Sequence, residues 1–300
     1  MSETNTEPYR AGFVTFVGRP NVGKSTLTNA LVGEKIVITS SKPQTTRRTV
    51  RGIVHRPNGQ LIIVDTPGIH RPRTLLGQRL NDMVEEVLTD VDVIGFCVPA
   101  GEPIGPGDRF INDQLDTAKQ ARKIAIVTKC EMVSKSKVGE QLLAVSELRD
   151  WDAIVPVSSL EDFNLEPLVG ELLAAMPESP QLYPDEMITE ETFEQRAAEL
   201  IREAALEGVH EELPHSIAVL IDDMDEGEDG VLELYASLFV ERESQKGIVI
   251  GHQASRLKRV RQRAAKQISA IAGEKVRVQL HVKVANNWQR DAKQLGKLGF

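Results

Sequence analysis

Short, continuous runs of apolar residues recur through the first half of the chain, and each ends in a polar or glycine-containing motif. Four of them have the length and continuity of strands buried on both faces: AGFVTFV from Ala11, QLIIVD from Gln60, KIAIVT from Lys123 and AIVPV from Ala153. The first run is followed by a glycine-bounded turn and an amphipathic segment, typical of a strand, a turn and a helix. We therefore expect an α/β domain, with a mostly parallel, doubly wound sheet and helices on both faces.

The periodicity changes around Pro177, Pro180 and Pro184, where few apolar residues recur regularly. Beyond them, residues 188–209 repeat at helical spacing, with Thr189 or Thr192 as the cap. Two strand-like runs, HSIAVLID and GVLELYASLFVERE, lie on either side of the acidic turn DDMDEGEDG. A third run alternates with polar residues at Val276, Val278, Leu280, Val282 and Val284. The pattern predicts four parts: a flexible tail at 1–10, an α/β domain at 11–177, a proline-rich linker at 178–190 and a smaller α+β domain at 191–300.

Size and composition restrict the class of protein. The chain has 300 residues, of which 41% are apolar, which suffices for two domains with their own cores. The longest apolar runs, such as VDVIGFCV, are far too short to cross a bilayer, and the N-terminus has no apolar segment of signal-peptide kind. Cys97 and Cys130 lie in separate apolar segments without metal-ligand spacing, so we expect two buried thiols. We expect a cytoplasmic protein.

The turn after the first apolar run reads G-x-x-x-x-G-K-S from Gly18 to Ser25. Its glycines let successive backbone N–H groups point at phosphate oxygens, and the N-terminus of the following helix adds a favourable dipole. In such a loop Lys24 reaches the β- and γ-phosphates, and the Ser25 hydroxyl binds Mg²⁺. We expect nucleotide contacts along the whole turn, from Gly18, Arg19, Pro20, Asn21, Val22, Gly23, Lys24, Ser25 and Thr26.

Two further motifs supply the remaining metal ligands. The apolar run from Gln60 ends in an aspartate that can hold the Mg²⁺ shell, followed by a glycine whose N–H can sense a γ-phosphate. The segment SKPQTTRR lies between the two motifs, and Thr46 rather than Thr45 is expected to close over Mg²⁺; the alternative is a plain solvated loop. The expected metal ligands are Ser25, Thr46 and Asp65, and the strand motif contributes Asp65, Thr66, Pro67 and Gly68 to nucleotide binding.

The third and fourth apolar runs carry the predicted base contacts. Guanine-specific switches place Asn-Lys-x-Asp after the third run, where the carboxylate accepts hydrogen bonds from guanine N1–H and the 2-amino group. Here the residues are TKCE, and the fourth run ends in SSL where such proteins have Ser-Ala-Lys or Ser-Ala-Leu. We favour guanine, because adenine has no donor pair that needs a carboxylate there; a nucleotidase of relaxed base choice is the alternative. The predicted contacts are Thr128, Lys129, Glu131, Ser158, Ser159 and Leu160.

The order GRPNVGKST, KPQTTR, DTPG, TKCE and VSSL resembles the Era family of bacterial GTPases. The segments MPESPQLYPDEMIT, LPHSIAVLID, FVERESQKGIVIG and LGKLGF also resemble that family, so the likeness runs from about Ala11 to Phe300. It implies a GTPase domain at 11–177 and a type II KH domain with a C-terminal extension at 191–300. It also implies a GTP-driven factor for 30S subunit assembly that binds the 3′ end of 16S ribosomal RNA. We expect a monomer, and family members can associate peripherally with the inner membrane.

The hydrolytic machinery departs from the usual pattern. Many GTPases orient the attacking water with a glutamine after the D-x-x-G glycine, but Ile69 stands there, so hydrolysis either is very slow or uses other groups. The resemblance implies that K⁺ bound at Asn21 supplies positive charge to the transition state; otherwise Asn21 is a loop hydrogen-bonder. The expected catalytic groups are Lys24, Asn21, Thr46 and Gly68. The nucleotide would set the orientation of the two domains through residues 38–48 and 68–76.

A basic segment stands out in a chain whose net charge is −8: from Ser244 to Gly273 there are Lys and Arg residues but no acidic ones. Apolar residues at helical spacing should pack inward, namely Leu257, Val260, Ala264, Ile268 and Ile271. Another face carries Arg256, Arg259, Arg263 and Lys266, with Lys258 and Arg261 beside it. KH domains hold single-stranded nucleic acid over a G-x-x-G turn, and a basic helix after it supplies the counter-charge.

The turn itself departs from the family's Gly-Lys-x-Gly. It reads Gly251-His252-Gln253-Ala254, so Ala254 adds a methyl group and His252 replaces a permanent charge with a ring that is mostly neutral at pH 7. We expect weaker or differently placed RNA binding. The predicted contacts are Lys246, Gly247, Gly251, His252, Gln253, Ala254, Arg256, Lys258, Arg259 and Arg263. The alternatives are a merely solvated helix face, contact with anionic lipid, or a signalling switch whose second domain binds a protein.

Overall fold

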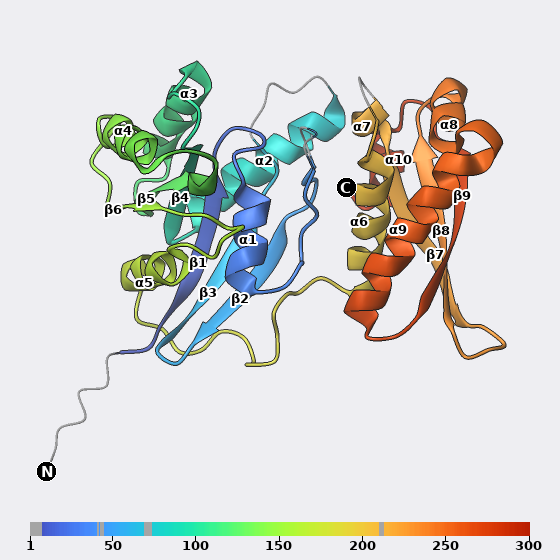
Figure 1. The fold of residues 1–300 in the computed structure, drawn as a ribbon, viewed down its shortest axis with the longest axis horizontal. Helices are drawn as coiled ribbons and strands as arrows, with labels where there is room; N and C mark the ends of the chain where they lie inside the picture. The colour runs from blue at the N-terminus through green and yellow to red at the C-terminus, as the bar shows by residue number, and fades with distance from the viewer. Residues whose placement is uncertain (1–7, 41, 43–44, 69–73, 210–212) are drawn as a thin grey trace, which may run out of the picture. The chain divides into compact units, whose positions relative to one another are not determined.

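The chain forms two compact units, each described here by itself (Figure 1). The computed structural model describes residues 8–40, 42, 45–68, 74–209 and 213–300. The first unit comprises Met1–Val37, Thr46–His70 and Leu80–Glu190, and the second comprises Ile38–Thr45, Arg71–Arg79 and Glu191–Phe300. Two short pieces of the first half of the sequence therefore group with the second unit. Ile69 and most of the predicted tail lie outside the described residues.

The first unit is built on a six-stranded sheet of order β2-β3-β1-β4-β5-β6. Its strands are β1 Arg10–Val17, β2 Val50–Arg56, β3 Gly59–Asp65, β4 Val93–Pro99, β5 Arg122–Thr128 and β6 Ala153–Pro156. All neighbouring strands pair in parallel except β2, which pairs antiparallel with β3. The carboxyl ends of parallel strands meet at one edge, and in such sheets ligands bind outside that edge. The predicted mostly parallel sheet is confirmed.

Helices cover both faces of this sheet (Figure 1). One face carries α1 Lys24–Val32 and α5 Leu165–Ala175; the other carries α2 Leu75–Asp90, α3 Pro106–Gln114 and α4 Lys135–Ser146. Short 3₁₀ turns follow α3 and β5, at η1 Leu115–Thr117 and η2 Cys130–Met132. Cys97 is buried as predicted, but Cys130 is only half-buried, because it begins the exposed turn that follows β5.

Residues 178–190, the predicted linker, are hydrogen-bonded along the first unit. The fully buried Gln60 side chain accepts from the N–H of Tyr183 at 3.0 Å and donates to its carbonyl oxygen at 2.9 Å. Further along, the N–H of Ile53 donates to the Ile188 carbonyl oxygen at 2.8 Å. This proline-rich segment is therefore held by hydrogen bonds to strands β2 and β3.

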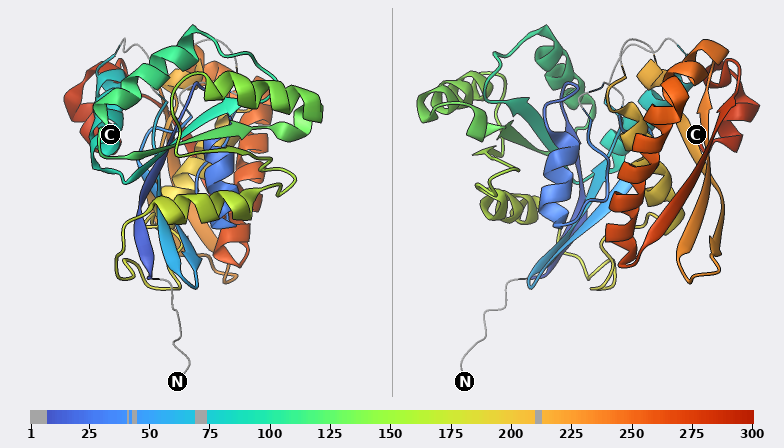
Figure 2. Two further views of the ribbon diagram at one scale, coloured as in Figure 1. Left: turned by 90° about the vertical axis from the view of Figure 1, so that its left-hand side faces the viewer. Right: turned by 45° about the vertical axis from the view of Figure 1, so that its right-hand side comes forward.

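The second unit contains a three-stranded sheet of order β7-β8-β9, covered on one face by helices, as Figure 2 shows. Its elements run α6 Phe193–Leu206, α7 Leu213–Ser216, β7 Ala218–Glu226, β8 Leu232–Val240, α8 Glu243–Ile250, η3 His252–Ala254, α9 Ser255–Ala272, β9 Val276–Val284, η4 Trp288–Arg290 and α10 Ala292–Lys297. Strand β8 pairs antiparallel with β7 and parallel with β9. The predicted order of helices and strands is confirmed.

Several local predictions for this unit can be compared with the structure. Thr192, not Thr189, caps α6, and its hydroxyl accepts from the N–H of Gln195 in a capping box. The apolar stripe of α9 packs inward, with Val260, Ala264 and Ile268 buried. The predicted acidic turn is too long, because strand β7 continues to Glu226 with its acidic side chains largely exposed.

Ile38, Thr39 and Thr45, from the predicted nucleotide-sensing region, contact residues of the second unit. Ile38 belongs to its hydrophobic core. The Thr39 N–H donates to Oε1 of Glu203 at 2.9 Å, and the buried Arg202 guanidinium donates to the Thr45 carbonyl oxygen.

Among the described residues, no helix has both the length and the hydrophobicity needed to span a bilayer.

Candidate nucleotide and nucleic-acid sites

The loop between β1 and α1 needs glycine at two positions. A Cβ on Gly18 would lie 2.5 Å from the Cys97 carbonyl oxygen, and Gly23 has φ 105°. Gly23 is the N-cap of α1, and no side chain caps this helix end. The first N–H groups of α1 therefore have no side-chain acceptor and are available for an anion.

The Lys24 ammonium is folded back over this loop. It donates to the carbonyl oxygens of Gly18 at 2.9 Å and Arg19 at 3.1 Å. Desolvation lowers the pKa of Lys24, while the Cys97 thiol and the Asp65 carboxylate act in the opposite direction. The ammonium thus lies within the loop, beside the uncapped end of α1, where a phosphate chain would need a positive charge.

Three predicted metal ligands come together at the end of β3. The buried Asp65 carboxylate accepts from the hydroxyls of Ser25 and Thr46 at 3.2 Å each, and these hydroxyls lie 3.3 Å apart. Burial raises the pKa of Asp65 to about 6, against the opposing effects of Lys24 and the hydroxyls. Thr45 instead donates to the Lys42 carbonyl oxygen. Thr46 is therefore the threonine placed beside Asp65.

This donor set suits Mg²⁺. Magnesium prefers oxygen ligands and usually takes only one or two from the protein, the rest coming from phosphates and water. No cluster of three His, Cys, Asp or Glu side chains suited to a metal occurs among the described residues. When bound, Mg²⁺ would supply positive charge to the phosphate oxygens and would favour the ionised form of Asp65.

Thr128 replaces the expected asparagine of the base motif and links two parts of the site. Its buried hydroxyl lies 2.6 Å from the carbonyl oxygen of Val22 and 3.3 Å from that of Val98. Lys129 follows in a left-handed conformation, φ 58°, and its ammonium donates to the Asn21 carbonyl oxygen at 2.5 Å. A shorter side chain thus still connects the base motif to the phosphate loop.

The Glu131 carboxylate retains an unused acceptor. Its Oε2 is buried and receives no hydrogen bond from the described part of the chain. A buried acceptor of this kind fits a ligand that brings its own donors, as the guanine N1–H and 2-amino group do. Nearby, Ser158 is buried and its Oγ accepts from the Glu161 N–H, whereas Leu160 is 74% exposed.

The side chain of Arg19, predicted to contact nucleotide, is used elsewhere. Its guanidinium donates to Oδ1 of Asp108 at 2.8 Å and to Oε2 of Glu102 at 2.9 Å. Asp108 is almost completely buried at the start of α3. These bonds hold the loop against α3 and leave only the Arg19 backbone for phosphate. Sequence reasoning missed Asp108, because it lies 89 residues away and in no recognised motif.

In the second unit, the turn before α9 contains three residues with positive φ. They are Gly251 at 73°, Gln253 at 48° and Ala254 at 57°. A Cβ on Gly251 would lie 2.8 Å from Cβ of Arg256, so glycine is needed there. Ala254 is the N-cap of α9, and again no side chain caps the helix end. Ala254 therefore holds a conformation that is unfavourable for any residue with a Cβ.

The predicted cationic face of α9 divides into engaged and exposed side chains. Arg256 donates to the carbonyl oxygens of Ala205 and Glu207, each at 2.9 Å, and so satisfies the C-terminal end of α6. Arg263 pairs with Glu207 at 2.5 Å. Lys258 and Arg259 are exposed. The Arg256 guanidinium is hydrogen-bonded to backbone in this structure, and its contact with RNA stays a prediction.

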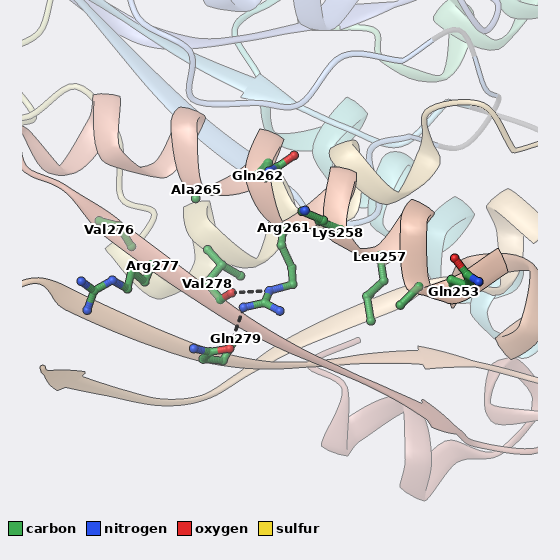
Figure 3. Close-up of a pocket in the computed structure, with 11 residues that line it drawn as sticks. Gln253, Leu257, Lys258, Arg261, Gln262, Ala265, Val276, Arg277, Val278 and Gln279 are labelled. Atoms are coloured by element: carbon green, nitrogen blue, oxygen red, sulfur yellow. Dashed lines mark hydrogen bonds between the residues drawn. The ribbon is translucent and has the colours of Figure 1, made fainter. Parts of the chain in front are cut away.

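An open groove of about 510 Å³ runs beside this face (Figure 3). It is bounded by the turn and α9 on one side and by the edge strand β9 on the other. The lining residues are Gln253, Ala254, Leu257, Lys258, Arg261, Gln262, Ala265, Val276, Arg277, Val278 and Gln279. Gln253, Ala254 and Lys258 are among the predicted RNA contacts. The lining residues of β9 are not, because in an alternating strand its polar residues are indistinguishable from solvated positions.

Comparisons with known proteins match residues in both units. Residues 13–129 match the family described as 50S ribosome-binding GTPase, and residues 212–289 match the KH domain. The chain is 58% identical over 296 residues to GTPase Era of Mycolicibacterium smegmatis, covering 97% of this chain and 99% of the relative. It is 53% identical over 313 residues to GTPase Era of Streptomyces coelicolor, covering 100% and 99%.

Two solved structures match at full length. One is Era in complex with MgGDPNP and nucleotides 1506–1542 of 16S ribosomal RNA, with a TM-score of 0.91, 35% identity, and coverage of 97% of this chain and 99% of that one. The other is a single-substitution variant of Aquifex aeolicus Era bound to GDP·AlF₄⁻, with a TM-score of 0.92 and the same identity and coverage.

Proposed function

The chain belongs to the Era family of GTPases, and we propose that it is a GTP-hydrolysing switch that binds 16S ribosomal RNA in assembly of the small ribosomal subunit. The observation that carries the proposal is that α1 and α9, which both begin without a side-chain cap after a residue with positive φ, also have cationic side chains at or near their first turns. The end of α1 fits a nucleoside triphosphate, and the end of α9 fits the sugar-phosphate chain of RNA.

The nucleotide half of the proposal assigns roles by position. Gly18 to Thr26 cradle the phosphates, with Lys24 as their counter-charge, and Gly68 senses the γ-phosphate. Ser25, Thr46 and Asp65 hold Mg²⁺, supported by their mutual distances of 3.2–3.3 Å. Glu131 takes the guanine donors on its buried acceptor, with Lys129 and Leu160 along the base. These roles extend to Thr66, Pro67, Thr128, Ser158 and Ser159.

The negative charge that develops on the phosphates during hydrolysis has to be stabilised without the usual glutamine. We propose slow hydrolysis that K⁺ accelerates at Asn21. Asn21 adopts φ 64° at an exposed point of the phosphate loop, and its carboxamide oxygen is a suitable ligand for a monovalent cation. A cation there adds positive charge beside the phosphates, where the transition state spreads negative charge.

The RNA half rests on the turn and groove beside α9. The RNA backbone would cross the turn from Gly251 to Ala254, with further contacts from Lys246, Gly247, Lys258, Arg259 and Arg263. The exposed Lys258 and Arg259 supply counter-charge. The groove beside them, about 510 Å³, has room for bases turned away from the phosphates. We propose domains at 11–177 and 191–300, joined by the linker at 178–190, in a cytoplasmic monomer.

The nucleotide would reach the RNA-binding unit through the segment that contains two adjacent threonines. Thr46 contacts Asp65 at the metal site, while the carbonyl oxygen of Thr45 accepts from Arg202 of the second unit. A change in the ligation of one threonine therefore moves the backbone that holds its neighbour. We propose this segment as the route by which GTP and GDP favour different domain arrangements.

A pull-down of ribosomal particles tests the whole proposal. Tagged protein loaded with a non-hydrolysable GTP analogue should retain 30S particles or their precursors, and protein loaded with GDP should retain far fewer. Filter binding of a short single-stranded RNA at two salt concentrations gives the direct measurement, with affinity falling steeply as salt rises. Recovery of no particles in either state, together with no salt-dependent RNA binding, would reject the function.

A further inference from the structure

Arg261 lies across the groove that separates α9 from β9 (Figure 3). Its Nε donates to the carbonyl oxygen of Val278 at 2.8 Å, and its Nη2 donates to Oε1 of Gln279 at 2.7 Å. Strand β9 is the edge of the three-stranded sheet, so this carbonyl faces the groove. The Arg261 guanidinium is therefore hydrogen-bonded to two residues of β9, which forms one wall of the groove.

These two bonds fix the orientation of the Gln279 carboxamide. A guanidinium has only donors, so the atom that it contacts must be the carbonyl oxygen of Gln279 and not the amide nitrogen. Rotating the carboxamide by half a turn would bring N–H groups against the cation and lose a charge-assisted hydrogen bond. The NH₂ group of Gln279 is what remains for a ligand, and it can only donate.

The other charged groups lining the groove are also donors. Lys258 is exposed and carries an ammonium. Arg277 is paired with Asp229 and with Glu233, which keeps its guanidinium in place on β9. Of the described side chains that line the groove, only the exposed carboxamides of Gln253 and Gln262 could turn an acceptor toward a ligand. The described side chains that line the groove therefore offer mainly hydrogen-bond donors.

We propose that Arg261 is a positioning residue that holds Gln279 as a donor, and that this pair makes the groove select cytosine over uracil in single-stranded RNA. The Watson–Crick edge of cytosine has two adjacent acceptors, O2 and N3, which suit adjacent donors. Uracil places an N3–H donor at that point, and it would face another donor without a partner. The inference rests on the proposed RNA binding.

The test compares two labelled ten-nucleotide RNAs, oligo(rC) and oligo(rU), by fluorescence anisotropy with the full chain at pH 7.5. The two probes have the same backbone charge and carry pyrimidine bases with different Watson–Crick edges. Wild-type protein should bind oligo(rC) about tenfold more tightly, the scale of one well-placed pair of base contacts. Repeating the titrations at two salt concentrations separates this preference from the general attraction to phosphate.

Three variants isolate the mechanism. Arg261→Lys keeps the charge but lacks the planar fork, so the carboxamide can turn and the cytosine preference should fall to near onefold with an unchanged salt dependence. Gln279→Glu replaces the donor with an acceptor and should bring the preference to uracil or abolish it. Lys258→Met is the matched control, since it removes a charge outside the pair. It should weaken both RNAs by a similar factor and keep their ratio.

Melting temperatures establish that each variant is folded, and a misfolded Arg261→Lys leaves Gln279→Glu to decide. Equal binding of the two RNAs by wild-type protein would overturn this inference alone. So would a cytosine preference that survives in both Arg261→Lys and Gln279→Glu. Failure of wild-type protein to bind either RNA would overturn the proposed RNA binding, and this inference with it.

Discussion

The turn before α1 and the turn before α9 are both suited to contact phosphate groups, but they are built from different residues. Each enters a helix that has no side-chain cap, and each has a left-handed residue at the N-cap, Gly23 before α1 and Ala254 before α9. The first turn encloses its ammonium, because Lys24 is folded over the loop and the buried Asp65 lies beside it, although Pro20 and Asn21 at its tip are exposed. The second is exposed from His252 to Ala254. Enclosure lets one ammonium act at low dielectric, whereas an open turn depends on several screened charges.

The largest effect that follows is the loss of nucleotide binding in Lys24→Ala. The ammonium is the enclosed charge of the first turn, and charge-assisted hydrogen bonds contribute about 1.5–3 kcal/mol each. We expect GDP and a GTP analogue to bind about a hundredfold more weakly by calorimetry. RNA binding by the nucleotide-free variant should match that of nucleotide-free wild-type protein. A parallel loss of RNA affinity would mean that the two turns do not act separately.

A change of monovalent cation should have the next largest effect. K⁺ is expected to raise the GTPase rate about tenfold over Na⁺ at equal ionic strength, a difference of roughly 1.4 kcal/mol in the barrier. In Asn21→Ala this difference should disappear. Phosphate release measured in the two salts gives the answer, and equal wild-type rates would remove the cation from the mechanism. RNA affinity should be the same in K⁺ and in Na⁺. This result would distinguish the turn before α1, where the cation acts, from the turn before α9.

The N-cap residues of α1 and α9, Gly23 and Ala254, can be exchanged for each other's residue type to test how far the left-handed conformation limits each turn. A left-handed conformation costs a residue with a Cβ roughly 1–2 kcal/mol. Ala254→Gly removes the methyl group where the RNA backbone should approach, so RNA affinity should rise about fivefold. The relieved strain should appear separately, as a higher free energy of unfolding. Gly23→Ala introduces strain at φ 105°, although the nearest atoms beyond its chain neighbours, on Thr128 and Lys129, lie 3.9 Å from the new Cβ, and nucleotide affinity should fall by at least as much. If Ala254→Gly binds RNA no better, the alanine is not what limits the turn.

The smallest effects should separate two neighbouring arginines. Arg259→Met removes an exposed charge, so RNA affinity should fall about threefold, and the slope of log affinity against log salt should decrease by about one. Arg256→Met removes the hydrogen bonds to Ala205 and Glu207 and should lower the free energy of unfolding by about 1 kcal/mol. Denaturant titration and anisotropy measure the two effects. Equal salt slopes for both variants would show that the structural distinction is wrong.

Local motifs explain why so much of the first site could be predicted. The phosphate loop, Asp65 and Thr46 are recognised from contiguous residues, and the structure brings Ser25, Thr46 and Asp65 together. Thr128 was predicted as a base contact, but its hydrogen bond to the Val22 carbonyl oxygen could not be predicted, because Val22 is 106 residues away. The imperfect base motif is therefore supported by a contact that no spacing rule shows.

The second site was less predictable for the same physical reason. Helical periodicity places Arg256 and Arg259 on one face but does not show that the end of α6, about 50 residues earlier, lies against only one of them. The alternation of β9 identifies Gln279 as a polar position. It does not show that Arg261 crosses to meet it. Partners distant in sequence decide which polar groups remain for a ligand.

The parallel pairing of β8 with β9 has a consequence for how the second unit acquires its ligand-binding surface. Parallel neighbours cannot be joined by a hairpin, so the chain must close a crossover through α8 and α9, and the turn at Gly251 lies in the middle of it. This closure joins residues that are distant in sequence, which is a slow class of folding event. By mass action, a bound RNA should then pull late intermediates toward the native state.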